Sequence, residues 1–288
     1  MKQSLRGLAV AAVAAVGLSV AASSAVADPS GDYAQFKYCP YTNPAVASCV
    51  YSVTDSGSFT LGSGTVPITS ATPIVLQGGI PDAASGSTTF YDAVGADTLS
   101  KTKLEVPGGL LGLMDTGGFT GALISAFNDA VAAVNDVYAT AELVGPVTFD
   151  LNSLFAEDGT AVGLPIRVHL ENPFLGPDCY IGSASDPITL HLTTGTTSPP
   201  GPNTPISGTA GTISFNDDYT ITTDAGVKLV DNAFAAPAAS NCGTTLVDKL
   251  LVTAAVNLKQ GLPAAAGKNT AIQQGTSKLA GAAAVAAS

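Results

Sequence analysis

Glycine and proline divide this chain into short segments, and this division restricts the folds open to it more than any other feature. The 288 residues include 31 Gly and 18 Pro, and apolar and polar residues tend to alternate between them. Alternation with a period of two is typical of β-strands that have one buried face. The sequence therefore predicts a mainly β, sandwich-like or barrel domain. The expected strands are Ala34–Tyr38, Ser48–Thr54, Ser58–Leu61, Ile74–Gln77, Thr88–Ala93, Thr102–Val106, Val147–Leu151, Pro165–Leu170, Ile188–Thr193, Thr212–Phe215, Tyr219–Thr222 and Val227–Val230.

Two segments instead follow the 3.6-residue period of an amphipathic helix. Residues Thr120–Val134 place their large apolar side chains on one stripe, and residues Thr244–Lys259 carry recurring leucines before a glycine and a proline that stop the helix. We therefore expect α-helices at about 120–134 and 244–259 in a β-sandwich-like domain. The end of the first helix is ambiguous, because Val137–Val144 alternates like a strand.

The N-terminus has the three zones of a secretory signal peptide. Lys2 and Arg6 precede the apolar run Leu8–Ala22, and the small residues Ala25–Ala27 form an A-x-A cleavage site. The apolar run is shorter than the roughly 20 residues that a membrane-spanning helix needs. We expect residues 1–27 to be removed, which predicts a secreted chain that begins at Asp28.

The charge of the mature chain disfavours several classes of partner. Removal of Lys2 and Arg6 leaves nine of the eleven basic residues against 22 acidic residues, a formal charge of −13. Phosphates repel such a chain, so we expect no nucleic-acid partner, and anionic lipid surfaces are disfavoured for the same reason. No segment of the mature chain has the length of a transmembrane helix, so an attachment to the cell wall would be non-covalent.

Four cysteines remain after removal of the signal peptide. An even number of cysteines in an exported chain predicts disulfides, and the spacing lacks the CxxC pairs of a zinc site. Three pairings are possible. We favour Cys39–Cys49 with Cys179–Cys242, since the first pair is close enough to close a short loop and the second would close a long one.

One continuous domain over residues 28–278 is the favoured organisation. Sub-boundaries are conceivable near 107–120 and at the proline-rich stretch 198–205, which cannot continue a strand. A Cys179–Cys242 bridge would cross the second of these, which favours a single unit. Residues 279–288 are expected to form an Ala-rich tail.

One predicted strand offers candidate catalytic residues. Alternation places Arg167, His169 and Glu171 on one face, about 7 Å apart, and a neighbouring strand carries His191. If the two strands pair, the two histidines could share a surface and build an acid–base or metal site. A charged row on the solvated face of a sheet is the commoner origin of such a pattern. The sequence predicts no cofactor and no metal, and it leaves the catalytic residues unassigned.

Other motifs are weaker. The chain has no G-x-S-x-G elbow, its acidic residues keep carboxylate-pair glycosidase chemistry open, and the segments around Glu157 and Asp217 favour solvated turns over calcium loops. The segment Val106–Met114 is an apolar, glycine-rich loop. Such a loop more often packs into the core, although an exposed one could touch lipid or a partner.

The stretch LPIRVHLENPFLGPDCYIG at Leu164–Gly182 resembles exported proteins of high-GC Gram-positive bacteria that have no assigned activity. The resemblance continues at Ser183–Ser207, Val230–Gly243 and Gly261–Ile272. It implies a location outside the cytoplasm and supplies no catalytic or binding residue.

These observations predict a secreted or cell-surface protein with a non-catalytic structural or interaction role and a partner in the cell envelope or another protein. Two alternatives remain open. The first is a secreted hydrolase that uses carboxylates or the histidine faces, and the second is a binding module for a lipid or another apolar ligand. A ligand carrier should contain an apolar cavity, whereas an enzyme should have a pocket with converging polar groups.

Overall fold

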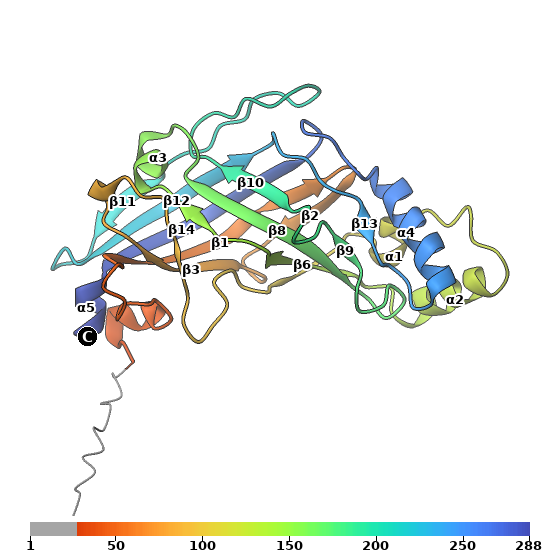
Figure 1. Ribbon diagram of the computed structural model, residues 1–288, viewed down its shortest axis with the longest axis horizontal. Coiled ribbons are helices and arrows are strands. Elements are labelled where there is room, and N and C mark those ends of the chain that lie inside the picture. Colours follow the sequence, from red (N-terminus) through yellow and green to blue (C-terminus); the bar gives the residue numbers. More distant parts are fainter. Residues whose placement is uncertain (1–27) are drawn as a thin grey trace, which may run out of the picture.

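The computed structural model describes residues 28–288, which form two antiparallel β-sheets packed face to face (Figure 1). The predicted signal peptide, residues 1–27, lies outside the described residues. Sheet 1 has the strand order β11 (Thr212–Phe215), β12 (Ile221–Asp231), β14 (Thr270–Gly281), β1 (Ser48–Leu61), β3 (Ile74–Ile80) and β4 (Tyr91–Asp92), with β2 (Gly64–Ile68) paired to β1. Sheet 2 has the order β13 (Ala239–Ser240), β9 (Tyr180–Ile181), β8 (Val162–Glu171), β6 (Tyr138–Leu143) and β5 (Lys103–Glu105), with β10 (Ile188–Leu192) and β7 (Thr148–Phe149) paired to β8. The predicted mainly β, sandwich-like class is confirmed.

Helices are few and short in the described chain. They are η1 (Gly31–Phe36), η2 (Ala83–Ser85), α1 (Gly109–Leu113), α2 (Gly121–Ala133), α3 (Leu151–Ala156), α4 (Leu246–Gln260) and α5 (Ala282–Ala286). The two predicted amphipathic helices are confirmed as α2 and α4. Helices α1, α2 and α4 gather at one end of the sandwich (Figure 1). None of the helices within residues 28–288 is both long and apolar enough to cross a membrane.

The C-terminal strand β14 lies between β1 and β12 near the middle of sheet 1. The sequence analysis did not predict it, because its buried positions carry small or polar residues such as Gln273, Gly275 and Ser277 instead of large apolar ones. A Cβ atom on Gly275 would lie 1.8 Å from the Val53 carbonyl oxygen, so only glycine allows this close approach of β1. Residues 279–281 end β14 and the next five form α5, so most of the expected Ala-rich tail belongs to the fold.

A strand predicted at Ala34–Tyr38 is wrong, because the 3-10 helix η1 covers most of that segment. Its alternation reflects one buried aromatic side chain, Phe36, rather than a strand face. Phe36 packs with Val285 of α5 and the Cys39–Cys49 disulfide in a small second core, which joins the two ends of the described chain.

Both predicted disulfides, Cys39–Cys49 and Cys179–Cys242, are present. In the chain-entropy model their loops correspond to about 3 and about 4 kcal/mol of stabilisation, respectively. The second bridge spans the proline-rich stretch 198–205, and the main hydrophobic core draws residues from both sides of that stretch.

The main core lies between the two sheets. Strand β8 shows the expected alternation, with Leu164, Ile166, Val168 and Leu170 buried on the inner face. Burying one such side chain contributes about 1.5–3 kcal/mol, which makes this inner face a large part of the driving force for folding.

Candidate ligand-binding site

The candidate residues Arg167, His169 and Glu171 lie on the outer face of β8, as alternation predicts. Arg167 donates to Oε2 of Glu142 on β6 through Nε at 2.9 Å and Nη2 at 2.7 Å. Its guanidinium carbon lies 4.0 Å from the ring centre of Tyr180, and the His169 ring stacks on the same Tyr180 ring at a centroid distance of 4.5 Å. These contacts indicate a structural network across β6, β8 and β9.

His169 and Glu171 are also occupied by neighbouring groups. The His169 Nε2 atom lies 3.0 Å from the Pro177 carbonyl oxygen, and Glu171 accepts hydrogen bonds from Lys103 and from Thr140, the latter at 2.9 Å. Desolvation alone would raise the pKa of Glu171, but these hydrogen bonds outweigh it and hold that pKa below its usual value. A carboxylate held ionised in this way is poorly suited to act as a general acid near neutral pH.

His191 does not join this network. Strands β8 and β10 pair, so both histidines belong to the same sheet, but His191 stands opposite Gly163, six residues from His169 along β8. That separation corresponds to about 20 Å. Beside His191, Asp231 uses Oδ2 to accept the His191 backbone N–H at 2.7 Å. Among residues 28–288, no group of three or more His, Cys, Asp or Glu side chains is arranged to hold a metal ion.

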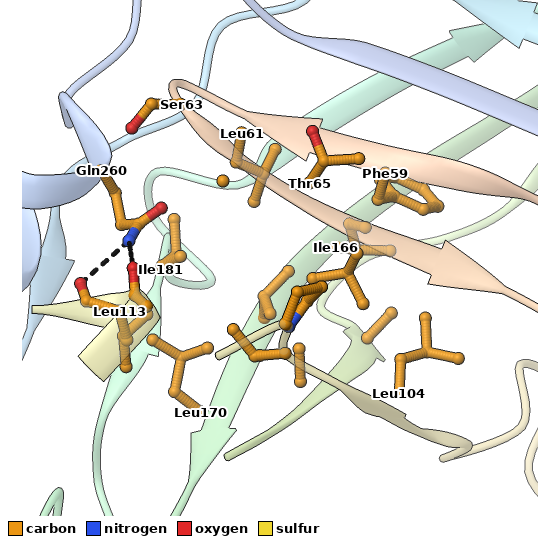
Figure 2. Close-up of a pocket in the computed structure, with 18 of the residues that line it drawn as sticks. Phe59, Leu61, Ser63, Thr65, Leu104, Leu113, Ile166, Leu170, Ile181 and Gln260 are labelled. Atoms are coloured by element: carbon orange, nitrogen blue, oxygen red, sulfur yellow. Dashed lines mark hydrogen bonds between the residues drawn. The ribbon is translucent and has the colours of Figure 1, made fainter. Parts of the chain in front are cut away.

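A cavity of about 480 Å³ lies between the two sheets at the end near α1 and α4 (Figure 2). Sheet 1 covers it with apolar side chains of β1, β2 and β3, and sheet 2 lines it with the inner faces of β5, β6, β8 and β9. The apolar lining residues are Phe59, Leu61, Val66, Ile74, Leu104, Val106, Leu113, Ala139, Ala141, Ile166, Val168, Leu170 and Ile181.

The small side chains of β6 leave room for this cavity. Ala139 pairs with Leu104 and Leu170, and Ala141 pairs with Val168, so two methyl groups stand where larger side chains would fill the space between the sheets. The neighbouring Leu143 lies opposite Ile166, beyond these two alanines. Interiors are normally packed to the density of organic crystals, so a space of this size is a built feature of the fold.

Gln260, the last residue of α4, closes one end of the cavity. Its Nε2 atom donates to the carbonyl oxygens of Gly112 at 3.1 Å and Leu113 at 2.9 Å, which fixes α4 to α1 (Figure 2). A Cβ atom on Gly64 would lie 2.3 Å from the Gln260 Oε1 atom, so a larger residue at this position of the β1–β2 hairpin would displace that side chain.

The exposed residues of the lining mark the mouth of the cavity, which Ser63, Thr65, Pro107 and Lys259 form. The Ser63 hydroxyl donates to the Lys259 carbonyl oxygen at 2.8 Å, and the Ser63 backbone N–H donates to the Gln260 carbonyl oxygen at 2.9 Å. The tip of the β1–β2 hairpin is therefore held against the end of α4. The result is an apolar interior with Ser63 and Lys259 among the residues at its mouth, whereas the Thr65 hydroxyl lies 2.9 Å from that of Thr60 on the outer face of the hairpin.

A buried carboxylate lies elsewhere, on β12. Asp224 has no exposed surface, and within residues 28–288 neither of its carboxylate oxygens has a hydrogen-bond partner. Desolvation raises the pKa of Asp224 to about 6. A Cβ atom on Gly211 would lie 2.4 Å from Oδ1, so glycine at that position makes room for the carboxylate.

No local pattern in the sequence marks the cavity as a site, although one contributing segment stands out. The sequence predicts that the apolar loop Val106–Met114 packs into the core, or touches lipid or a partner if it is exposed. Four of its residues line the cavity, namely Val106, Pro107, Gly112 and Leu113. Comparisons with protein-family models, curated proteins and solved structures found no match to this chain.

Proposed function

We propose that this protein is secreted and binds, without catalysis, one hydrophobic molecule, such as a single-chain lipid, in the cavity between its sheets. The observation that carries the proposal is the combination of an apolar interior and a polar mouth. The volume of about 480 Å³ falls in the range of about 300–1,000 Å³ that small-molecule sites occupy. An amphiphile would place its chain among the leucine, isoleucine and valine side chains and its head group beside Lys259.

The proposed location outside the cytoplasm has its own support. Two disulfides are compatible with an oxidising compartment, and the sequence of residues 1–27 has the zones of an export signal. A ligand with low solubility in water would need a carrier in that compartment. A cell-wall association remains part of the proposal.

The hydrolase alternative has less support in the described residues. Arg167, His169 and Glu171 lie on the outer face of sheet 2, whereas the apolar cavity lies against its inner face. His191 is about 20 Å further along the sheet. The four candidate residues therefore share no cavity with converging polar groups.

Binding of the fluorescent fatty acid parinaric acid, with displacement by lysophosphatidylcholine, tests the proposal. The substitution Ala141→Phe should place a ring in the cavity and weaken parinaric acid binding by at least about tenfold. Ala132→Phe, on the exposed face of α2, is the matched control and should bind like the wild type. Thermal unfolding of each variant verifies that the fold is kept.

If Ala141→Phe does not fold, Ala139→Leu provides a smaller plug at the neighbouring position. Unchanged affinity in either folded plug variant would show that the fatty acid binds outside the cavity. The proposal is also overturned if the wild-type protein binds neither parinaric acid nor lysophosphatidylcholine.

A further inference from the structure

Helix α4 exposes an apolar face along its whole length. Leu246, Leu250 and Leu258 are 83%, 73% and 72% exposed, and Val247 and Leu251 lie beside them. Residues three, four and seven positions apart lie on one side of a helix, so these side chains form one stripe of about 20 Å. We call these five residues, with the exposed Ala254 between them, the outer face of α4.

The opposite side of α4 is apolar as well. Val252 and Val256 are fully buried against the protein, so the helix already has a core-facing side. A surface helix normally presents polar residues to water, and a contiguous exposed apolar patch marks an interaction site. Packing within the fold accounts for the inner side alone.

Charged groups are absent from the outer face of α4. Asp248 and Lys249 lie at its flank, where Lys249 pairs with Asp178 at 3.7 Å. Lys259 is the exposed charged residue of the helix, and it stands at the mouth of the cavity. The outer face therefore leads, through Leu258, directly to the rim of the candidate ligand site.

A further exposed apolar side chain lies at the same end of the molecule. Leu111 of α1 is 58% exposed, and α1 is fixed to α4 by the hydrogen bonds of Gln260 and by the Asp115 N–H bonded to the Ala255 carbonyl oxygen at 3.2 Å. Figure 1 shows α1 and α4 together at the end of the sandwich.

We infer that the outer face of α4 docks on the surface of an uncharged or zwitterionic lipid bilayer, with the cavity mouth turned toward the lipid. An apolar helix face can lie in the interfacial plane of a bilayer, where its leucines leave water. The uncharged face suits a zwitterionic surface, whereas the acidic chain as a whole is repelled by an anionic one.

The position of this face beside a lipid-sized cavity favours a bilayer over a protein partner. Docking through this face would place the cavity mouth against the bilayer, which holds hydrophobic molecules. The ligand could then pass between the bilayer and the cavity without crossing water. The transfer step rests on the proposed function, but the docking step does not. The two can therefore fail separately.

Flotation with dioleoylphosphatidylcholine vesicles tests the docking. The wild-type protein should float with the vesicles, and the combined variant L246S, L250S and L258S should lose at least about tenfold in partition coefficient. A variant with Ile213→Ser, Phe215→Ser and Tyr219→Ser is the matched control. It removes three exposed apolar side chains from β11 and the turn that follows it and should float like the wild type.

Parinaric acid binding and thermal unfolding of the α4 variant should be unchanged, because the substituted side chains touch neither the cavity nor the core.

Failure of the wild type to float, or an equal loss of partition coefficient in both variants, would overturn the inference. A wild-type dimer that the α4 substitutions dissociate would also overturn it, because the face would then bind a second copy. If Ala141→Phe floats but does not bind parinaric acid, the docking stands independently of the ligand. Addition of an anionic lipid to the vesicles should weaken flotation at low salt.

Discussion

The two faces of strand β8 differ in the way their chemistry is used. The outer face carries Arg167, His169 and Glu171, residue types common in catalytic sites, yet each contacts neighbouring groups of the same sheet or of the loop between β8 and β9. The inner face carries Ile166, Val168 and Leu170, which look like ordinary core residues, yet they border open space. The side chains of β8 that remain free to contact a ligand are therefore the apolar ones of the inner face.

This contrast shows that reactive residue types are a weak guide to a site when their partners are unknown. On a solvated sheet face, cross-strand neighbours such as Glu142 and Tyr180 pair with the side chains that spacing alone would assign to catalysis. A cavity depends instead on what is missing, here the bulk that Ala139 and Ala141 do not supply.

The largest expected effect comes from truncating the inner face. Ile166→Ala should lower the free energy of unfolding by about 2–5 kcal/mol, because it removes buried methyl groups and leaves more empty volume beside the cavity. Arg167→Ala, the next residue on the opposite face, should cost about 1 kcal/mol. Denaturant unfolding of both variants measures the difference, and equal costs would break the contrast between the faces.

The sequence predicts the face that each β8 residue occupies, because a period of two depends only on the local backbone. It also predicts helices α2 and α4 and both disulfides, since amphipathic stripes and an even number of cysteines are local or countable signals. Strand β14 escapes prediction because its buried positions hold Gln273, Gly275 and Ser277, whose burial is decided by β1 and β12.

The cavity also escapes prediction for a physical reason. Its two walls come from Phe59 and Val168, which are more than a hundred residues apart in the chain, and no local pattern records how far apart the sheets stand. The outer face of α4 has a sequence signal, the recurring leucines of Thr244–Lys259. Such a stripe normally faces the core, whereas Leu246, Leu250 and Leu258 face water.

The carboxylates of Glu171 and Asp224 show the same contrast between groups with and without hydrogen-bond partners. The pKa of Glu171 is lowered by its partners, whereas the pKa of buried, unpartnered Asp224 is raised to about 6. Asp224→Asn should raise the free energy of unfolding at pH 7 by about 1–3 kcal/mol, because the amide carries no charge to desolvate.

The sign of the pH dependence follows from the raised pKa of Asp224. Its protonated form stabilises the fold fully below the unfolded pKa near 4, and this contribution is lost as the pH rises through about 6. The difference between the unfolding free energies of the wild type and Asp224→Asn should therefore grow between pH 4 and pH 7. A constant difference across that range would mean that Asp224 does not titrate there.

The smallest expected effect is that of Glu142→Gln on the outer face. The substitution keeps the shape of the side chain but removes the charge that Arg167 and His169 face, so the free energy of unfolding should fall by about 0.5 kcal/mol, and by less at high salt. Parinaric acid affinity should not change, because Glu142 points away from the cavity that its neighbour Ala141 lines. Thermal unfolding and a binding titration of the same preparation measure both quantities. A tenfold loss of affinity with little loss of stability would show that the outer network controls the cavity, and the two faces of β8 would then be one functional unit.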